Sequence, residues 1–130
     1  MPIPTACKLA LNVSRPDLDC LQAFAIAVLG AEAVHQEPGL WAGKLPDGNL
    51  LELYGPGANP PACLFAHGPV VVSFRVANLG QAMEQAQAAG LLTVSGPTDI
   101  CPGLSHGYLR LADGMIIGLY EALTAESQIR

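Results

Sequence analysis

The chain has 130 residues and a formal net charge of −5, and 51% of its residues are hydrophobic while 13% are charged. This length and composition predict one domain with a sizeable hydrophobic core, and they exclude a disordered chain. No apolar run approaches the ~20 residues of a membrane span, and the six basic residues are scattered. Neither a membrane nor a nucleic acid is therefore an expected partner.

The first half of the chain predicts a strand, a helix and three further strands. Residues 7–13 alternate in hydrophobicity as a strand does. Residues 15–30 predict a helix with Pro16 near its start and Gly30 as its stop. Short strands are then expected within residues 31–36, 40–45 and 49–54.

The second half repeats this order after a segment rich in proline and glycine. That segment, residues 55–69, has the composition of a linker. A strand is expected over residues 70–76, followed by a helix over 78–90 that Asn78 caps. Three strands are again expected, near residues 91–95, 106–112 and 115–121.

One stretch shows the repeat most clearly. DGNLLELY begins at Asp47 and DGMIIGLY begins at Asp113, and in both the Asp-Gly pair is typical of a tight turn. The two stretches differ in charge at one position, because Glu52 in the first is Gly118 in the second. A carboxylate within an apolar strand predicts a functional or structural partner for it.

The chain resembles the vicinal oxygen chelate superfamily, which includes glyoxalase I, extradiol dioxygenases, methylmalonyl-CoA epimerase and bleomycin resistance proteins. The resemblance rests on the repeated βαβββ order, on LALNVS before a helix that ends in VLG, on PDGNLLEL, and on GPTDI before LADG. It covers residues 7–123. It implies an α+β fold in one domain, 1–130, whose modules at about 7–54 and 70–123 curl their sheets into a cup, with a linker at about 55–69.

The resemblance also indicates where metal ligands would lie, on the first and last strands of each module. These positions fall on Lys8, Glu52, Val71 and Gly118. Only Glu52 retains a side chain that binds metals, because an ammonium has no lone pair and Val and Gly offer no side-chain donor. We therefore expect no metal and no cofactor. We expect instead an ion pair between Lys8 and Glu52, which makes Glu52, the only candidate catalytic residue, a poor general base.

The three histidines lie outside those positions. His35, His67 and His106 are each expected at the surface or at a strand edge. The alternative is a displaced metal site in which His106 or His35 acts together with Glu52.

Strand alternation predicts which other side chains share the face of the cup. Along each strand, a residue two or four positions away from one of the four metal-ligand positions points to the same side of the sheet. The expected ligand-binding residues are Lys8, Asn12, Glu52, Tyr54, Ser73, Arg75 and Tyr120. A concave, mostly apolar surface with a few polar groups is typical of a small-molecule pocket, and a structural charge network that fills the cup is the alternative.

These features favour a metal-free protein that sequesters or carries a small organic molecule, and they argue against an enzyme. One alternative is a lyase, isomerase or dioxygenase of the same superfamily that uses a non-standard metal site or Glu52 as a base. Another is an interaction module with a vestigial site. Fold resemblance alone does not decide among them.

The first predicted helix also indicates self-association. Its segment AFAIAVLG, residues 23–30, is apolar nearly all round, which predicts that a partner subunit covers it and that the protein is a homodimer. No secretion-signal pattern occurs at the N-terminus, so we expect a cytoplasmic protein. The four cysteines have no paired spacing and are expected to be reduced thiols.

Overall fold

The structure is a computed structural model that describes residues 6–101 and 104–122. Its elements follow the order βαβββ twice, as predicted. The first module contains β1 (Cys7–Asn12), α1 (Arg15–Ala27), β2 (Glu32–Glu37), β3 (Leu40–Lys44) and β4 (Leu50–Tyr54). The second contains β5 (Val70–Arg75), α2 (Leu79–Ala88), β6 (Leu92–Cys101), β7 (Leu104–Arg110) and β8 (Ile116–Ala122).

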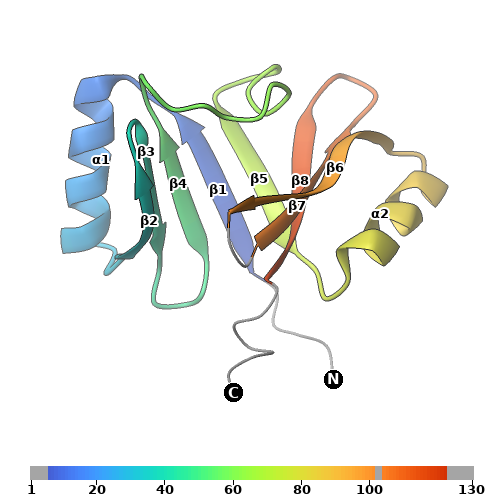
Figure 1. Cartoon of the computed structure of the whole chain (residues 1–130), viewed down its shortest axis with the longest axis horizontal. Helices are drawn as coiled ribbons and strands as arrows, with labels where there is room; N and C mark the ends of the chain where they lie inside the picture. Colours follow the sequence, from blue (N-terminus) through green and yellow to red (C-terminus); the bar gives the residue numbers. More distant parts are fainter. Residues whose placement is uncertain (1–5, 102–103, 123–130) are drawn as a thin grey trace.

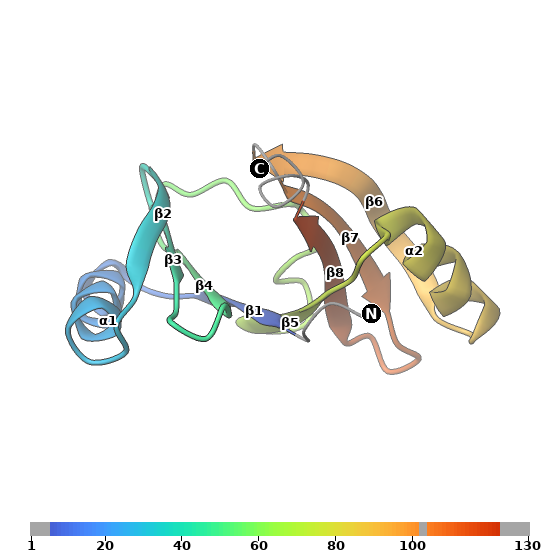
Figure 2. The same ribbon diagram turned by 90° about the horizontal axis from the view of Figure 1, so that it is seen from below.

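All eight strands form one curved sheet, in the order β2-β3-β4-β1-β5-β8-β7-β6. The first strands of the modules, β1 and β5, pair antiparallel at its centre. Each also pairs in parallel with the last strand of its own module, β4 or β8. The sheet bends into an open trough with α1 and α2 on its outer face (Figures 1 and 2). The predicted α+β fold with a cup is confirmed.

Two matching turns set the register of the hairpins β3–β4 and β7–β8. Gly48 and Gly114 have φ angles of 94° and 100°, which a residue with a Cβ rarely adopts. In each turn the preceding aspartate, Asp47 or Asp113, accepts a hydrogen bond from the backbone N–H two residues on, at 3.0 Å. The turns thus form as the repeated Asp-Gly pair predicts.

A side chain caps the N-terminus of each helix, and each helix buries one of its sides against the sheet. Ser14 caps α1 with its hydroxyl, and Asn78 caps α2 by accepting from the backbone N–H of Gln81 at 3.0 Å, as predicted. Leu18 and Ala25 of α1 are buried against the first module, and α2 covers the second in the same way.

The segment between the modules does more than connect them. Residues 55–69 cross the concave side of the sheet (Figure 2). Leu64 is buried in an apolar cluster that includes Ala10 and Val71, and the ring of Phe65 meets that of Tyr54 edge-on at 5.3 Å between centroids. This part of the cup is filled by side chains of the chain itself.

Part of the outer surface stays apolar and exposed in the single chain. On α1, Phe24 and Ile26 are each 48% exposed. A second exposed patch lies between the helices, where no helix covers β1 and β5 (Figure 1), and it contains Leu9, Val70 and Phe74. The helix is therefore buried on one side only within one subunit.

Within the described residues, neither helix is long and apolar enough to cross a membrane. Cys7, Cys20 and Cys63 are free thiols, and the side chain of Cys101 lies outside the described residues.

Candidate functional site

A buried ion pair lies on the floor of the cup, as the sequence predicts. Strands β1 and β4 run parallel with Ala10 beside Glu52, so that Lys8 and Glu52 project from neighbouring strands onto the concave face. The Lys8 Nζ lies 3.3 Å from both carboxylate oxygens of Glu52. Lys8 is 2% exposed and Glu52 is 8% exposed. Two charges this deeply buried persist only because each neutralises the other.

His106 joins Lys8 and Glu52 to form a buried cluster of three side chains, and its Nε2 contacts the Lys8 Nζ. His106 is 1% exposed, so the prediction that it lies at the surface or at a strand edge is wrong. The physical reason is that β7 begins at Leu104, two residues earlier than predicted, which places His106 inside the strand. Its partner across the hairpin is Tyr120, which faces the cup.

The His106 ring is neutral, and its tautomer follows from its partner. Burial first, and then the charge of Lys8, lower the pKa of His106 from 6.5 to about 3. An ammonium only donates hydrogen bonds, so Nε2 accepts from Lys8 and the ring hydrogen lies on Nδ1. Nδ1 is buried and has no hydrogen-bond partner among the described residues. Such a buried donor costs about 1–3 kcal/mol until an acceptor meets it.

Tyrosine rings enclose the cluster and supply a further donor. The Tyr54 hydroxyl donates to Glu52 Oε1 at 3.1 Å, so Glu52 accepts from both Tyr54 and Lys8. The rings of Tyr108 and Tyr120 each stack on His106 at 6.2 Å between centroids. The Lys8 Nζ also lies 5.7 Å from the centroid of the Tyr120 ring, within the range of a cation–π contact.

The other predicted cup residues divide into a buried and an exposed set. Ser73 and Tyr120 are buried, and Arg75 is half-buried. Burial raises the pKa of Tyr120, an effect that the nearby guanidinium of Arg75 partly offsets, so its phenol is protonated at neutral pH. Asn12 lies exposed at the end of β1, outside the buried cluster.

The donors in this cluster do not fit a divalent metal ion. Glu52 and His106 are the two residues that a displaced metal site would use, and the Lys8 ammonium contacts both. No group of three His, Cys, Asp or Glu side chains within the described residues is placed to hold a metal. His35, on the edge strand β2, pairs with Glu37 at 2.6 Å, and His67 is exposed, so these two lie where the sequence predicts.

Sterics explain why the counterpart of Glu52 is Gly118. A Cβ at Gly118 would lie 2.2 Å from the Oγ of Ser73 and 3.1 Å from a ring carbon of Tyr108. Ser73 is beside Gly118 in the parallel pairing of β5 with β8, and it is also beside Lys8 across β1. A side chain at position 118 would therefore require Ser73 to move.

No known protein-family model matches the sequence, and no curated protein matches it either. Solved structures do resemble it. Methylmalonyl-CoA epimerase from Mycobacterium tuberculosis has a TM-score of 0.63 at 18% identity, over 94% of this chain and 89% of that one. A glyoxalase/bleomycin resistance protein/dioxygenase superfamily member from Vibrio splendidus has a TM-score of 0.59 at 15% identity, over 91% of this chain and 99% of that one.

A third resembling structure, the Mn(II)-bound glyoxalase from Novosphingobium aromaticivorans, has a TM-score of 0.62 at 16% identity. The match covers 92% of this chain and 38% of that one. The chain thus has the glyoxalase/bleomycin resistance/dioxygenase fold, and the structural neighbours predicted from the sequence are confirmed. Identities this low carry a likeness of fold and not of chemistry.

We predict that Gly118→Ala lowers the free energy of unfolding by about 1–3 kcal/mol, because the new methyl group overlaps Ser73. Urea denaturation measures this. Gly68→Ala is the matched control, since no atom lies within 4 Å of a Cβ there. Adding Ser73→Ala to Gly118→Ala should recover part of the loss, and a Gly118→Ala variant as stable as the wild type would contradict the steric account.

We also predict that His106 makes the protein less stable in mild acid. The unfolded state takes up a proton near pH 6.5, whereas folded His106 does so only near pH 3, so stability falls as the pH drops through this window. Between pH 7 and pH 5 the loss from this group is about 2 kcal/mol. Lys8, Tyr108 and Tyr120 face the ring directly, and Glu52 lies behind Lys8.

Urea denaturation at pH 7, 6 and 5 tests this prediction. His106→Gln keeps an acceptor for Lys8 but removes the titrating ring, so its stability should change about 2 kcal/mol less between pH 7 and pH 5. His67→Gln is the matched control, because it removes an exposed histidine that lies outside the cluster. Equal slopes for His106→Gln and the wild type would show that His106 is not the group responsible.

Proposed function

We propose that this protein binds a small organic carboxylate in its cup without a metal ion, as a sequestering or carrier protein. The observation that carries the proposal is the buried Nδ1–H of His106, which has no hydrogen-bond partner among the described residues. An oxygen acceptor on a ligand would remove the cost of this donor. Buried polar groups of a purely structural cluster are normally satisfied within the protein.

Charge supports an anionic ligand over a neutral or cationic one. Lys8 is balanced by Glu52, and Arg75 is a second cation on the same face of the sheet, beside Tyr120 in the β5–β8 pairing. A carboxylate that accepts from His106 would also lie near these cations, which favours the ionised form of the ligand. Tyr54, Tyr108 and Tyr120 provide the apolar and aromatic wall for its hydrocarbon part.

The enzyme alternative is less well supported by the contacts of Glu52. A structural neighbour is an epimerase, and a lone carboxylate is able to move a proton. Here both oxygens of Glu52 lie within reach of Lys8, and one also accepts from Tyr54, so a substrate proton would compete with two established donors. Glu52 is therefore suited to holding Lys8 in place.

One observation favours the third alternative, an interaction module with a vestigial site. Leu64 and Phe65 pack on the concave face beside Tyr54, so part of the cup is filled. The cluster around Leu64 also includes Tyr108 of β7 and Ile116 of β8, so the filled part extends to the strands that carry His106 and Tyr120. A ligand that reaches His106 would therefore have to displace part of the segment 55–69.

We predict that benzoate, phenylpyruvate or isobutyrate raises the melting temperature of chelator-treated protein. Binding to the folded state alone stabilises it by about 2.7 kcal/mol at a ligand concentration 100 times Kd. The double variant Lys8→Met with Glu52→Gln should lose this response. We expect the double variant to keep the fold, because replacing both members of a buried ion pair is often neutral for stability, whereas Lys8→Met alone leaves a buried carboxylate unpaired and costs about 3–5 kcal/mol.

Each outcome of the titration decides between the candidate functions. A response in chelated wild type that disappears in the double variant supports a metal-free binder. A response that requires Mn²⁺, Zn²⁺ or Fe²⁺ overturns the proposal in favour of a metal-dependent enzyme. No response with or without these ions, over carboxylates of all three shapes, overturns it in favour of the interaction module.

We further propose that the protein is a homodimer in which α1 meets a partner subunit, and that it is cytoplasmic. Phe24 and Ile26 support the dimer, because both are large apolar side chains that α1 leaves 48% exposed, and exposed apolar side chains are typical of an interface. Phe24→Glu should convert a dimer to a monomer in sedimentation velocity at micromolar concentration. Phe74→Glu, in the other exposed patch, should leave the dimer intact, and the opposite result would move the interface to the central strands.

A further inference from the structure

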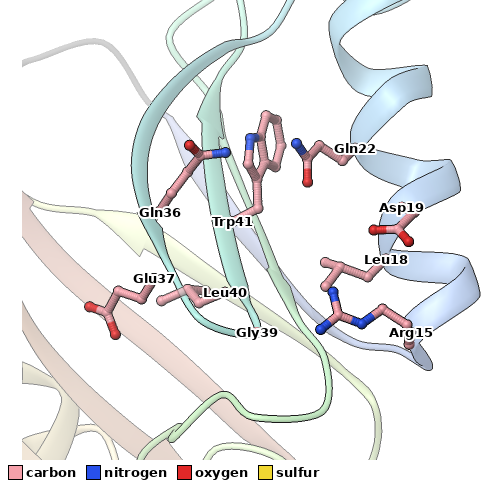
Figure 3. Close-up of a pocket in the computed structure, with 9 residues that line it drawn as sticks. All are labelled: Arg15, Leu18, Asp19, Gln22, Gln36, Glu37, Gly39, Leu40 and Trp41. Atoms are coloured by element: carbon pink, nitrogen blue, oxygen red, sulfur yellow. The ribbon is translucent and has the colours of Figure 1, made fainter.

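A cavity of about 300 Å³ lies on the opposite side of the sheet from the cup, between α1 and the hairpin of β2 and β3 (Figure 3). This volume is at the lower end of small-molecule sites. Nine residues line it: Arg15, Leu18, Asp19, Gln22, Gln36, Glu37, Gly39, Leu40 and Trp41. None of them belongs to the cup cluster, so the cavity is separate from the site proposed above.

Trp41 reaches this cavity because of the alternation along β3. Leu40 and Ala42 face the concave side, whereas Trp41 lies on the side of α1, packed with Leu18 and Ala25. Gly43 makes room for the indole, since a Cβ there would lie 2.3 Å from a carbon of the Trp41 ring. The absence of a side chain at Gly43, two residues further along β3, thus allows the indole to occupy this position.

The indole nitrogen is a buried donor without an acceptor. Trp41 is 2% exposed, and its Nε1–H has no hydrogen-bond partner among the described residues. Figure 3 shows the indole between Gln36 on β2 and Gln22 on α1, with its nitrogen on the side of Gln36. The amide nitrogen of Gln36 is turned toward the indole nitrogen, so two donors face each other. An acceptor oxygen placed between them would satisfy both.

The charges on the lining argue for a neutral ligand. Arg15 and Asp19 of α1 contribute one cation and one carboxylate, and the other carboxylate of the lining, Glu37, pairs with His35 and points away from the indole (Figure 3). This balance of charge favours a neutral ligand over a carboxylate. Primary amides both donate and accept, so Gln22 and Gln36 are suited to recognise another amide.

We propose that this cavity is a second small-molecule site, which binds a neutral amide or lactam with a flat apolar body. The carbonyl oxygen of the ligand accepts from the Trp41 Nε1–H and from the Gln36 amide. Its apolar body lies against the indole and against Leu18. The site recognises its ligand by hydrogen bonds, whereas the cup selects for charge.

The experiment uses the fact that Trp41 is the only tryptophan in the chain. Its indole N–H gives a single resonance in a ¹H–¹⁵N spectrum, and this resonance reports directly on a new hydrogen bond. Benzamide is the probe, and benzoate, which has the same ring but a charge, is the control. We expect a saturable downfield shift with benzamide and a much weaker response with benzoate. Gln36→Leu should weaken benzamide binding about five-fold, the value of one hydrogen bond.

Two results would overturn the proposal. One is an indole resonance that benzamide does not move in a saturable way. The other is a large upfield shift and faster hydrogen exchange of the indole N–H in ligand-free Gln36→Leu, which would show that Gln36 has turned its amide oxygen to Trp41 and already satisfies it. The double variant Lys8→Met with Glu52→Gln should bind benzamide normally, so the outcome at this cavity is independent of the outcome at the cup.

Discussion

The arrangement of the cup depends on one buried ammonium group. A lysine that is 2% exposed must have its charge neutralised and its N–H groups accepted, because an unpaired buried cation would lose its proton or unfold the site. Glu52 supplies the charge, and neutral His106 supplies a second acceptor. Burial and the Lys8 charge lower the pKa of His106 and keep its ring neutral. The charge of Lys8 therefore helps to maintain His106 as the acceptor for its own N–H group.

The three side chains of this cluster come from strands that span five positions in the sheet. Lys8 lies on β1, Glu52 on the adjacent β4, and His106 on β7, with β5 and β8 between β1 and β7. Small residues stand on those intervening strands at the level of Lys8, namely Ser73 and Gly118. The curvature of the sheet and these small residues together bring distant strands within reach of one side chain.

The sequence predicts the part of this site that follows from the internal repeat and the resemblance. Hydrophobic periodicity and the internal repeat predict the module order and the Asp-Gly turns. The metal-ligand positions that the resemblance indicates predict the pairing of Lys8 with Glu52. His106 was placed wrongly because its strand begins at Leu104, and strand boundaries are poorly marked in a sequence. A usable signal was present: counting outward from the second turn in pairs places His106 opposite Tyr120, a residue already predicted to face the cup.

Other features had no signal in the sequence. The burial of Leu64 within a segment rich in proline and glycine depends on where that segment crosses the sheet, which composition does not reveal. The cavity beside Trp41 depends on the spacing between α1 and the β2–β3 hairpin, and this spacing is a property of tertiary packing. Periodicity identifies which face of a strand a residue occupies, but not how closely a helix approaches that face.

The difference between Glu52 and Gly118 then has an electrostatic as well as a steric reason. A lysine carries one charge, so one carboxylate balances it, and a second would leave an uncompensated negative charge in a buried site. Balancing one buried ammonium with one carboxylate therefore requires the two modules to differ at this position. The repeat is broken at the residue where charge balance requires it, and the space is taken by Ser73 and Tyr108.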